Sequence, residues 1–436
     1  MASPMTSEQV RAKHKEFMIP AVANYYEQPV VMHEGKGTRI RDLDGKEYLD
    51  FFGGILTVSV GHNNPRVNAA VMQQVQRLSH VSTLYPTVPM VELAEKLVGI
   101  APGKLKKAFF TASGTEADET AVGLAQVHTG CTELIALRHG YSGRSMLAQS
   151  LTAHSNYRSV PTQIAGIKHG LSPYCYRCPL KLEPGTCGIA CAKDLEELIK
   201  TTTTGRIAGM LAEPIQGVGG FITPPKEYFE IAAEIIRKYG GVMIIDEVQT
   251  GFGRTGKMWG SEQYGVEPEI MTGAKGIANG YPLAMTLCTT EIANSFKSAT
   301  ISTFGGNPVS CAAASAVVDE IVENDLVANS AARGAELRAG LEALKKKYPK
   351  TIGDVRGMGL MQALELVVDE TTRDRTPNPQ ATVRLFEETK KRSLLIGKGG
   401  LYGNTIRIAP ALNVTKGEIE DAVKVLDESF GAMGVG

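Results

Sequence analysis

The stretch GGVMIIDEVQTG, residues 240–251, decides how this chain folds. Its apolar residues 242–245 predict a short buried strand that ends at the carboxylate of Asp246. A second apolar run, EIMTGAKG at residues 269–276, ends in the same way at Lys275. Ligands of open α/β sheets bind where the carboxyl ends of the strands meet. The sequence therefore predicts that Asp246 and Lys275 share a ligand site at one edge of a sheet.

Further short apolar runs alternate with helical periodicity on both sides of this stretch. Such runs between helices are typical of a mostly parallel sheet that helices cover on both faces, so an α/β fold is predicted. The expected strands of this sheet are 107–111, 134–137, 207–212, 242–245 and 270–272.

A smaller α+β unit is expected after this sheet. A helical segment at roughly 309–347 leads to it, and a capping box at Thr415 and Glu418 announces its closing helix. Its strands are expected near 359–367 and 405–409. The predicted domains are an N-terminal arm with part of the small domain (1–65), a large domain (66–315) and a C-terminal small domain (316–436).

The bulk composition excludes several function classes. Among 436 residues, 46 Lys and Arg balance 46 Asp and Glu, so no overall charge favours nucleic acid or an anionic membrane as partner. No apolar stretch approaches the roughly 20 residues that span a bilayer. The first residues lack the basic and apolar regions of a secretory signal. A cytoplasmic enzyme with no nucleic-acid or membrane partner is expected.

The pairing of an acid with a lysine suits pyridoxal phosphate (PLP). A lysine can hold this cofactor covalently, and an acid can partner its pyridinium nitrogen. Most lysines are surface charges, but Lys275 lies between an apolar run and GIANGYPL, where partial burial would lower its pKa and make it a nucleophile. The G-x4-G-K pattern at 251–257 suggests a P-loop instead. Met258 replaces the Ser or Thr that such a loop requires, which argues against it.

Other motifs also follow predicted strands. Ser113, Gly114 and Thr115 form a small polar turn before a helix, where backbone N–H groups can bind an anion, although an ordinary helix cap has the same composition. Three further candidates are Tyr141, which could stack on a planar ring, Glu213 at a strand end, and Arg407 inside an apolar strand. A buried arginine prefers a bidentate carboxylate partner, and a substrate carboxylate would serve.

Together these motifs resemble the class III (ω-amino acid) aminotransferases of the PLP fold-type I superfamily, from about residue 30 to the C-terminus. Within that class the chain is most similar to the alanine–glyoxylate type 2 branch, through TFGGNP and GDVRGMGLM. The motifs that carry the resemblance are SGTEA (113–117), EPIQG (213–217), DEVQTGFGR (246–254), AKG (274–276), TFGGNP (303–308) and GDVRGMGLM (353–361).

The resemblance implies a large domain with a mostly parallel mixed sheet, a smaller α+β domain, and a role for each motif. Lys275 would hold PLP and shuttle the proton, and Asp246 would pair with the ring nitrogen. Arg407 would bind the α-carboxylate, and Glu213 would pair with Arg407 when an ω-amine substrate leaves it free. The remaining implied cofactor contacts are Val248 and Tyr141 on the ring faces, Gln249 on the ring hydroxyl, Ser113, Gly114 and Thr115 on the phosphate, and Thr303 on the phosphate from the neighbouring subunit. One departure is Ser142, where the family commonly has His.

The expected activity is therefore transamination by a ping-pong mechanism. The donor would be alanine or an ω-amino acid or amine, the acceptor pyruvate or glyoxylate, and the assembly a homodimer or a dimer of dimers. A PLP-dependent aminomutase or decarboxylase would share Asp246 and Lys275 and stays an alternative.

A cysteine cluster stands apart from this chemistry, and no metal is assigned to the catalytic site. Its C-x2-C-x8-C-x3-C spacing fits a structural zinc, local disulfides or thiols of a surface loop, and these three interpretations stay open. A non-enzymatic, zinc-stapled binding protein is the remote alternative. The cluster consists of Cys175, Cys178, Cys187 and Cys191.

Overall fold

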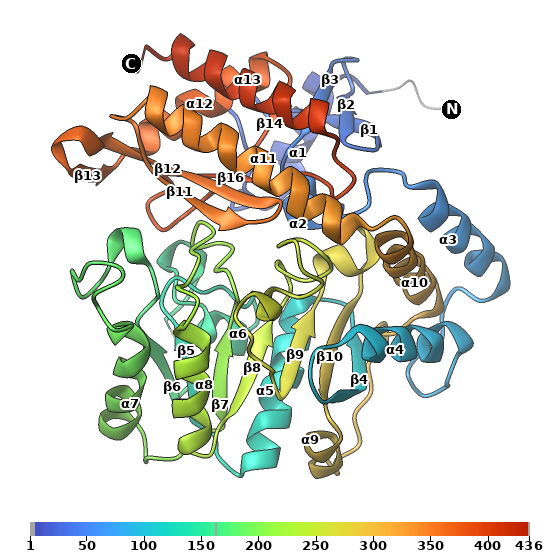
Figure 1. Cartoon of the computed structure of the whole chain (residues 1–436). Coiled ribbons are helices and arrows are strands. Elements are labelled where there is room, and N and C mark those ends of the chain that lie inside the picture. Colours follow the sequence, from blue (N-terminus) through green and yellow to red (C-terminus); the bar gives the residue numbers. More distant parts are fainter. Residues whose placement is uncertain (1–4, 162–163, 435–436) are drawn as a thin grey trace.

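A seven-stranded sheet forms the centre of the computed structural model, which describes residues 5–161 and 164–434 (Figure 1). Neighbouring strands from β6 to β9 run parallel, whereas β10 is antiparallel to both β9 and β4. The predicted mostly parallel α/β sheet is confirmed. In spatial order its strands are β4 (Leu105–Thr111), β10 (Ala284–Thr289), β9 (Ile270–Gly273), β8 (Val242–Asp246), β7 (Gly209–Ala212), β5 (Leu134–Leu137) and β6 (Ile167–Gly170).

Helices cover both faces of this sheet because successive strand residues point to opposite sides. Ile135 and Leu137 pack with α7 and α8 on one face. Leu134 and Ala136 pack with α5, α6 and α9 on the other. These helices are α5 (Gly114–Thr129), α6 (Met146–Leu151), α7 (Ala190–Thr202), α8 (Tyr228–Lys238) and α9 (Thr290–Ser295).

Three helices flank the β4 end of the sheet. They are α3 (Pro65–Arg77), α4 (Val88–Ile100) and α10 (Pro308–Glu323). The expected boundary at residue 315 falls inside α10, which packs on α3 and α4 along its length. The helical segment expected at 309–347 is two helices, because Asp325 adopts a left-handed φ of 49° between α10 and α11 (Leu326–Lys347). The two helices are therefore separated at Asn324 and Asp325.

The small domain joins the N-terminal arm to the last third of the chain. The strands of its first sheet follow the order β1, β2, β3 and β14, and β14 runs parallel to β3. The neighbouring strands of its second sheet, β11, β12, β16 and β15, run antiparallel. The strands are β1 (Met32–Lys36), β2 (Arg39–Asp42), β3 (Glu47–Asp50), β14 (Leu394–Leu395), β11 (Ile352–Met358), β12 (Met361–Asp369), β16 (Thr405–Ile408), β15 (Gly397–Gly399) and β13 (Asp374–Pro377). The helices are α1 (Ser7–Phe17), α2 (Gly53–Leu56), α12 (Pro379–Lys391) and α13 (Lys416–Ala432), and α13 begins with the predicted capping box.

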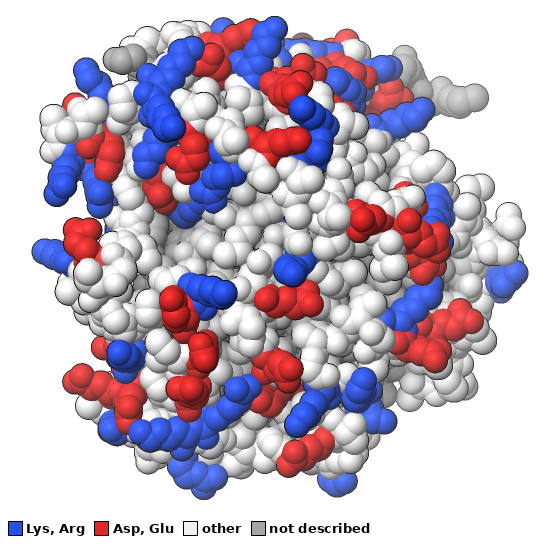
Figure 2. Space-filling model, viewed as in Figure 1, with Lys and Arg blue, Asp and Glu red and all other residues white. Residues whose placement is uncertain are grey.

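The two domains meet at the edge of the large sheet where β7, β8 and β9 end (Figure 1). The face seen in Figure 2 carries acidic and basic side chains interspersed, without a large area of one sign. Of the helices that the structure describes, none is long and apolar enough to cross a membrane.

The four clustered cysteines line one small cavity beneath the loop that precedes α7. Each is a free thiol, so local disulfides are not formed. Within residues 5–161 and 164–434, no group of three or more His, Cys, Asp or Glu side chains is arranged to hold a metal ion. The structure thus places these thiols as the lining of a packed loop.

Candidate active site

Asp246 and Lys275 meet at the carboxyl edge of the sheet, as their strand ends predict. Asp246 is the last residue of β8 and lies opposite Thr272 of β9. Lys275 follows two residues after β9 and begins the short helix η4 (Lys275–Ala278). Its φ of 46° is a left-handed value that costs a non-glycine residue about 1 to 3 kcal/mol and is typical of functional sites.

A cavity of about 300 Å³ lies in front of this pair, within the range of small-molecule sites. Six of the residues that the sequence singled out for the cofactor line it with Asp246 and Lys275, namely Ser113, Gly114, Thr115, Tyr141, Val248 and Gln249. Gly114 packs tightly here, because a Cβ at this position would lie 3.3 Å from Val248 Cγ2. The large sheet thus brings together motifs that lie far apart along the chain.

The N-terminus of α5 forms one end of the cavity. Ser113 caps this helix. Its hydroxyl accepts a hydrogen bond from Glu116 N and donates one to the Glu116 carboxylate. Thr115 Oγ1 accepts a hydrogen bond from Arg144 N at 3.3 Å. Gly143 lies so close that a Cβ there would come within 1.8 Å of Thr115 Oγ1. The unpaired N–H groups of a long helix are therefore presented to the cavity, which is the arrangement that binds phosphate.

Three carboxyl groups are buried around the lysine, and burial dominates their protonation. Burial raises the pKa of Asp246 to about 6. Burial and the charge of Asp246 raise the pKa of Glu213 to about 8, and the same two causes raise the pKa of Asp118 well above its ordinary value. Burial lowers the pKa of the Lys275 amine, although Asp246 and Glu213 oppose that shift. The site therefore holds a lysine that loses its proton more readily than a surface lysine.

Glu213 and Arg407 lie near the cavity without lining it, and they are not paired with each other. Glu213 accepts hydrogen bonds from Tyr141 N at 3.1 Å and Gly217 N at 2.7 Å. Arg407 donates to Lys398 O at 2.9 Å and to Gly217 O at 3.4 Å. The pairing of Glu213 with Arg407 in the presence of an ω-amine substrate stays a prediction, and in this structure one backbone N–H donates to each oxygen of the Glu213 carboxylate.

Thr303 and Ser142 complete the residues that sequence reasoning named. Thr303 is exposed in the loop before α10 and does not line the cavity of its own chain. Ser142, in place of the common His, is buried in the cavity wall, and its N–H donates to Thr152 Oγ1 at 3.0 Å. The P-loop interpretation of 251–257, which Met258 already argued against, finds no support, because Gly253 and Gly256 pack against α11 at Val327 and Ala331.

The cavity also contains side chains that sequence reasoning missed. Asp118 lies one helical turn after Gly114 on α5 and accepts a hydrogen bond from Thr272 Oγ1 at 2.8 Å. That four-residue spacing on one helix face was the signal that could have found it. Thr57, Arg144 and Tyr281 also line the cavity, and nothing in their local sequence sets them apart.

Comparisons with known proteins agree with this geometry. A model of the class-III aminotransferase family matches residues 21–430. The chain is 40% identical over 429 residues to alanine–glyoxylate aminotransferase 2 homolog 2 of Arabidopsis thaliana, covering 98% of this chain and 88% of that one. It is 36% identical over 409 residues to a 5-aminovalerate aminotransferase of Pseudomonas putida, covering 92% and 93%. An amine transaminase from an uncultivated Pseudomonas species, solved with PLP bound, superimposes with a TM-score of 0.89 at 34% identity over 97% and 99% of the chains.

The chain belongs to the class-III aminotransferases, and it is a PLP-dependent transaminase. The residues of the cavity fit that cofactor. Gln249 Oε1 is buried and has no hydrogen-bond partner among the described residues, so a polar group of a ligand can donate a hydrogen bond to it. The N-terminus of α5 suits a phosphate, and Asp246 suits a protonated ring nitrogen.

The raised pKa of Asp246 predicts a pH-dependent stability of the cofactor-free protein. A carboxyl whose folded pKa of about 6 exceeds its ordinary 3.8 costs no stability below pH 3.8 and costs most above pH 6. We expect Asp246→Asn to stabilise the cofactor-free protein at pH 7.5 by about 1 to 3 kcal/mol, and this gain should shrink as the pH falls from 6 to 4.

Urea unfolding of both proteins at pH 7.5, 5.5 and 4.0 measures this difference. Glu267→Gln, at an exposed acid of the same domain, serves as the control and should give no comparable gain. An Asp246→Asn variant that is less stable than the parent protein at pH 7.5 would contradict the prediction.

Proposed function

We propose that the enzyme transfers the amino group of alanine or an ω-amino acid to pyruvate or glyoxylate, and that Arg407 binds the substrate carboxylate. The observation that supports this is the burial of Arg407, which is 3% exposed. Its guanidinium donates to backbone oxygens and forms no ion pair with a carboxylate of the residues that the structure describes. Its guanidinium lies 4.9 Å from the ring centre of Phe52 and 5.6 Å from that of Phe221. A buried guanidinium without a counter-ion is costly, so a substrate anion is the partner that this position favours.

The roles of the cavity residues follow from their positions. Bound PLP supplies a ring that accepts the electrons released when the substrate carbon loses its proton. The Lys275 amine, whose pKa burial lowers, holds the cofactor and afterwards takes and returns that proton at Nζ. Asp246 holds a proton on the ring nitrogen, and the N-terminus of α5 with Ser113, Gly114 and Thr115 anchors the phosphate.

The remaining contacts orient the ring and exclude water. Val248 and Tyr141 would pack against its two faces, and Gln249 would bond its hydroxyl through the unpartnered Oε1. Donor and acceptor use the same lysine and the same guanidinium, so the donor's product must leave before the acceptor binds. This shared use is the physical basis of a ping-pong mechanism.

Glu213 would favour ω-amino substrates in the way that the resemblance implies. It lies beside the site with a pKa of about 8, so near neutral pH it is mostly protonated. A carboxyl in that state adds little negative charge against a substrate carboxylate at Arg407. When the substrate leaves Arg407 empty, ionisation of Glu213 would supply the missing counter-ion.

A second copy of the chain is the proposed partner, and a dimer of dimers is the larger assembly in the same proposal. An apolar patch of exposed side chains lies on two adjoining loops and the start of α4, and it is formed by Leu84, Tyr85, Val88, Ile301 and Phe304. Thr83 and Ser302 join these loops, with Ser302 N donating to Thr83 Oγ1 at 2.9 Å. Such a patch marks a protein interface. Thr303 lies inside it and would reach the phosphate site of the partner.

The proposed location is a reducing compartment such as the cytoplasm. The seven cysteines are free thiols, which supports this location, and cell fractionation tests it.

The attachment of the cofactor can be tested directly. Borohydride reduction of the holoenzyme, followed by peptide mass spectrometry, should find the cofactor on the peptide that contains Lys275. Lys275→Ala should lose that label, the visible absorbance of the bound cofactor and all half-reaction turnover. The matched control is Lys257→Ala, whose lysine belongs to the excluded P-loop pattern and should leave all three unchanged.

The same half-reaction separates the alternatives. Only a transaminase releases a keto acid from the donor and leaves the amine on the cofactor. An aminomutase or a decarboxylase would consume the substrate without that stoichiometric exchange, and this outcome would reject transamination.

Arg407→Gln should raise KM for alanine and lower kcat/KM about 10- to 100-fold, because a charge-assisted contact is lost. Arg407→Lys should retain part of the affinity, because the positive charge remains but the paired N–H donors that bind both oxygens of a carboxylate are lost. Initial rates with alanine and pyruvate measure both effects. An Arg407→Gln variant with an unchanged KM would reject the carboxylate assignment.

Tyr85→Asp should shift the protein towards the monomer and reduce its activity, because a charge is placed inside the apolar patch. Light scattering after size exclusion and a rate assay on the same fractions measure the two effects. Val383→Asp introduces the same charge at an exposed apolar side chain of the small domain and should remain at the parent's mass and rate. A monomeric parent protein with full activity would contradict the dimer.

A further inference from the structure

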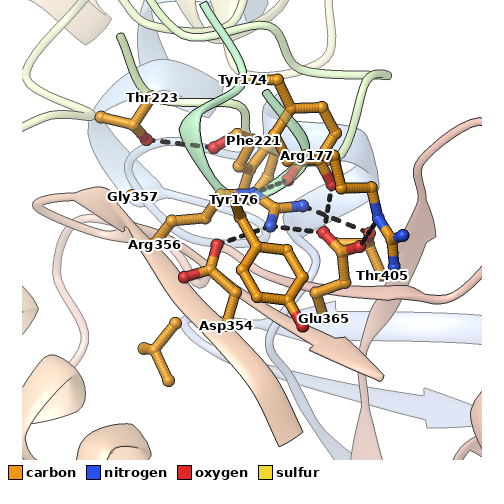
Figure 3. Close-up of polar contacts among 12 residues, drawn as sticks. Tyr174, Tyr176, Arg177, Phe221, Thr223, Asp354, Arg356, Gly357, Glu365 and Thr405 are labelled. Carbon is orange, nitrogen blue, oxygen red and sulfur yellow. Dashed lines mark hydrogen bonds and ion pairs between the residues drawn. The ribbon is translucent and has the colours of Figure 1, made fainter. Parts of the chain in front are cut away.

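A buried ion-pair network joins the two domains, and Figure 3 shows its side chains. None of the labelled residues lines the catalytic cavity. At the centre of the network, Arg356 of β11 contacts Glu365 of β12 at 2.6 Å and Asp354 at 2.8 Å. Glu365 is fully buried and also accepts hydrogen bonds from Tyr174 and Arg177 of the large domain. The Arg356 guanidinium lies 4.9 Å from the centre of the Tyr174 ring. The network therefore includes side chains from both domains.

Arg356 also holds backbone of the large domain. Its Nε donates to Gly220 O at 2.8 Å, and its Nη2 lies 3.4 Å from Thr405 Oγ1. Gly220 has a φ of 98°, which favours glycine, and a Cβ there would come within 2.9 Å of Thr405 Oγ1 and 3.1 Å of Arg356 Nη2. The loop at 217–220 is thus pressed against the small domain at this point and fixed there by one guanidinium.

The other end of the same loop reaches the catalytic residues. Gly217 N donates to Glu213, and Gly217 O accepts from Arg407. A Cβ at Gly217 would lie 2.1 Å from Gln249 Nε2, so this amide rests directly on the loop backbone. Four residues of chain therefore connect the Arg356 contact to the proposed carboxylate site and to the cofactor-facing amide.

The arginines of the network do not form an anion site, although they line a cavity of about 590 Å³. Three guanidinium groups line that cavity, those of Arg177, Arg356 and Arg375. Each already contacts a carboxylate, since Arg177 and Arg356 contact Glu365 and Arg375 contacts Glu370. Their charge is therefore satisfied within the protein, and their geometry serves to hold chain segments together.

We propose that Arg356 is a positioning residue for the transamination reaction. It acts through Gly220 O, by fixing the 217–220 loop in the position at which Gly217 meets Arg407, Glu213 and Gln249. Glu365, clamped from the large domain by Tyr174 and Arg177, keeps the guanidinium of Arg356 directed at the loop. Substrate affinity then depends on a residue that touches neither substrate nor cofactor. The expected effect on affinity rests on the carboxylate role proposed for Arg407.

The test compares three variants of the holoenzyme in alanine and pyruvate kinetics. Arg356→Gln removes the charge and the fork, whereas Arg356→Lys keeps a charge beside Glu365 and protects folding. One ammonium group cannot hold Glu365, Thr405 and Gly220 O together. Arg375→Gln is the matched control, because it removes an arginine from the same cavity that does not touch the loop. Cofactor absorbance per chain and the melting temperature are measured for each.

We expect both Arg356 variants to raise KM for alanine about tenfold, with kcat per bound cofactor changed less than about threefold. Arg375→Gln should keep the parent's KM. A purely structural role would instead lower the cofactor content or the melting temperature and leave KM unchanged. Either that pattern or an Arg356→Lys variant with the KM of Arg375→Gln would overturn the proposal.

Arg407→Gln, measured in parallel, separates this inference from the proposed function. If it leaves KM unchanged while the Arg356 variants raise KM, the carboxylate role of Arg407 is rejected and the positioning role of Arg356 stands, acting through Glu213 and Gln249. If Arg407→Gln raises KM and both Arg356 variants do not, the positioning role is rejected and the carboxylate role stands.

Discussion

Burial of charge at the carboxyl edge of the large sheet is the constraint on which the rest of the structure depends. Three acids and one lysine are withdrawn from water there, and each shifts its pKa towards the neutral form. Such a cluster opposes folding when no ligand is bound. Bound PLP would supply one partner that the chain lacks, because a protonated ring nitrogen suits the buried Asp246.

The geometry of the fold allows only a narrow solution to that requirement. In the proposed arrangement, the phosphate would face the N-terminus of α5, the ring nitrogen would meet Asp246 at the end of β8, and the lysine would approach from the end of β9. Adjacent parallel strands deliver the last two groups side by side. The turn after β9 then adopts the left-handed φ at Lys275, so the chain accepts local strain in order to direct the amine into the cavity.

The sequence was sufficient for those parts of the fold and site that depend on local pattern. The strands that end at Asp246 and Lys275, the capping box of α13 and the polar turn of α5 are encoded in short windows, and their meeting follows from parallel topology. The strand β10 was not among the expected strands, and the break at Asp325 was missed because periodicity continues across a single left-handed residue. The partners of Glu213 and the contact between Arg356 and Gly220 were also missed, because they join segments far apart in the chain.

The division of the site between two domains explains why glycine is required in the 217–220 loop. Lys275 and Asp246 belong to the large domain, whereas Arg407 belongs to β16 of the small domain. Their relative position is set where backbone of one domain touches side chains of the other, and at Gly220 this contact leaves no room for a Cβ beside Thr405 and Arg356. A substitution in this seam would therefore move the proposed carboxylate site relative to the lysine. If Arg407 binds the substrate carboxylate as proposed, the domain interface, as much as the cavity wall, sets the distance between the two ends of the substrate.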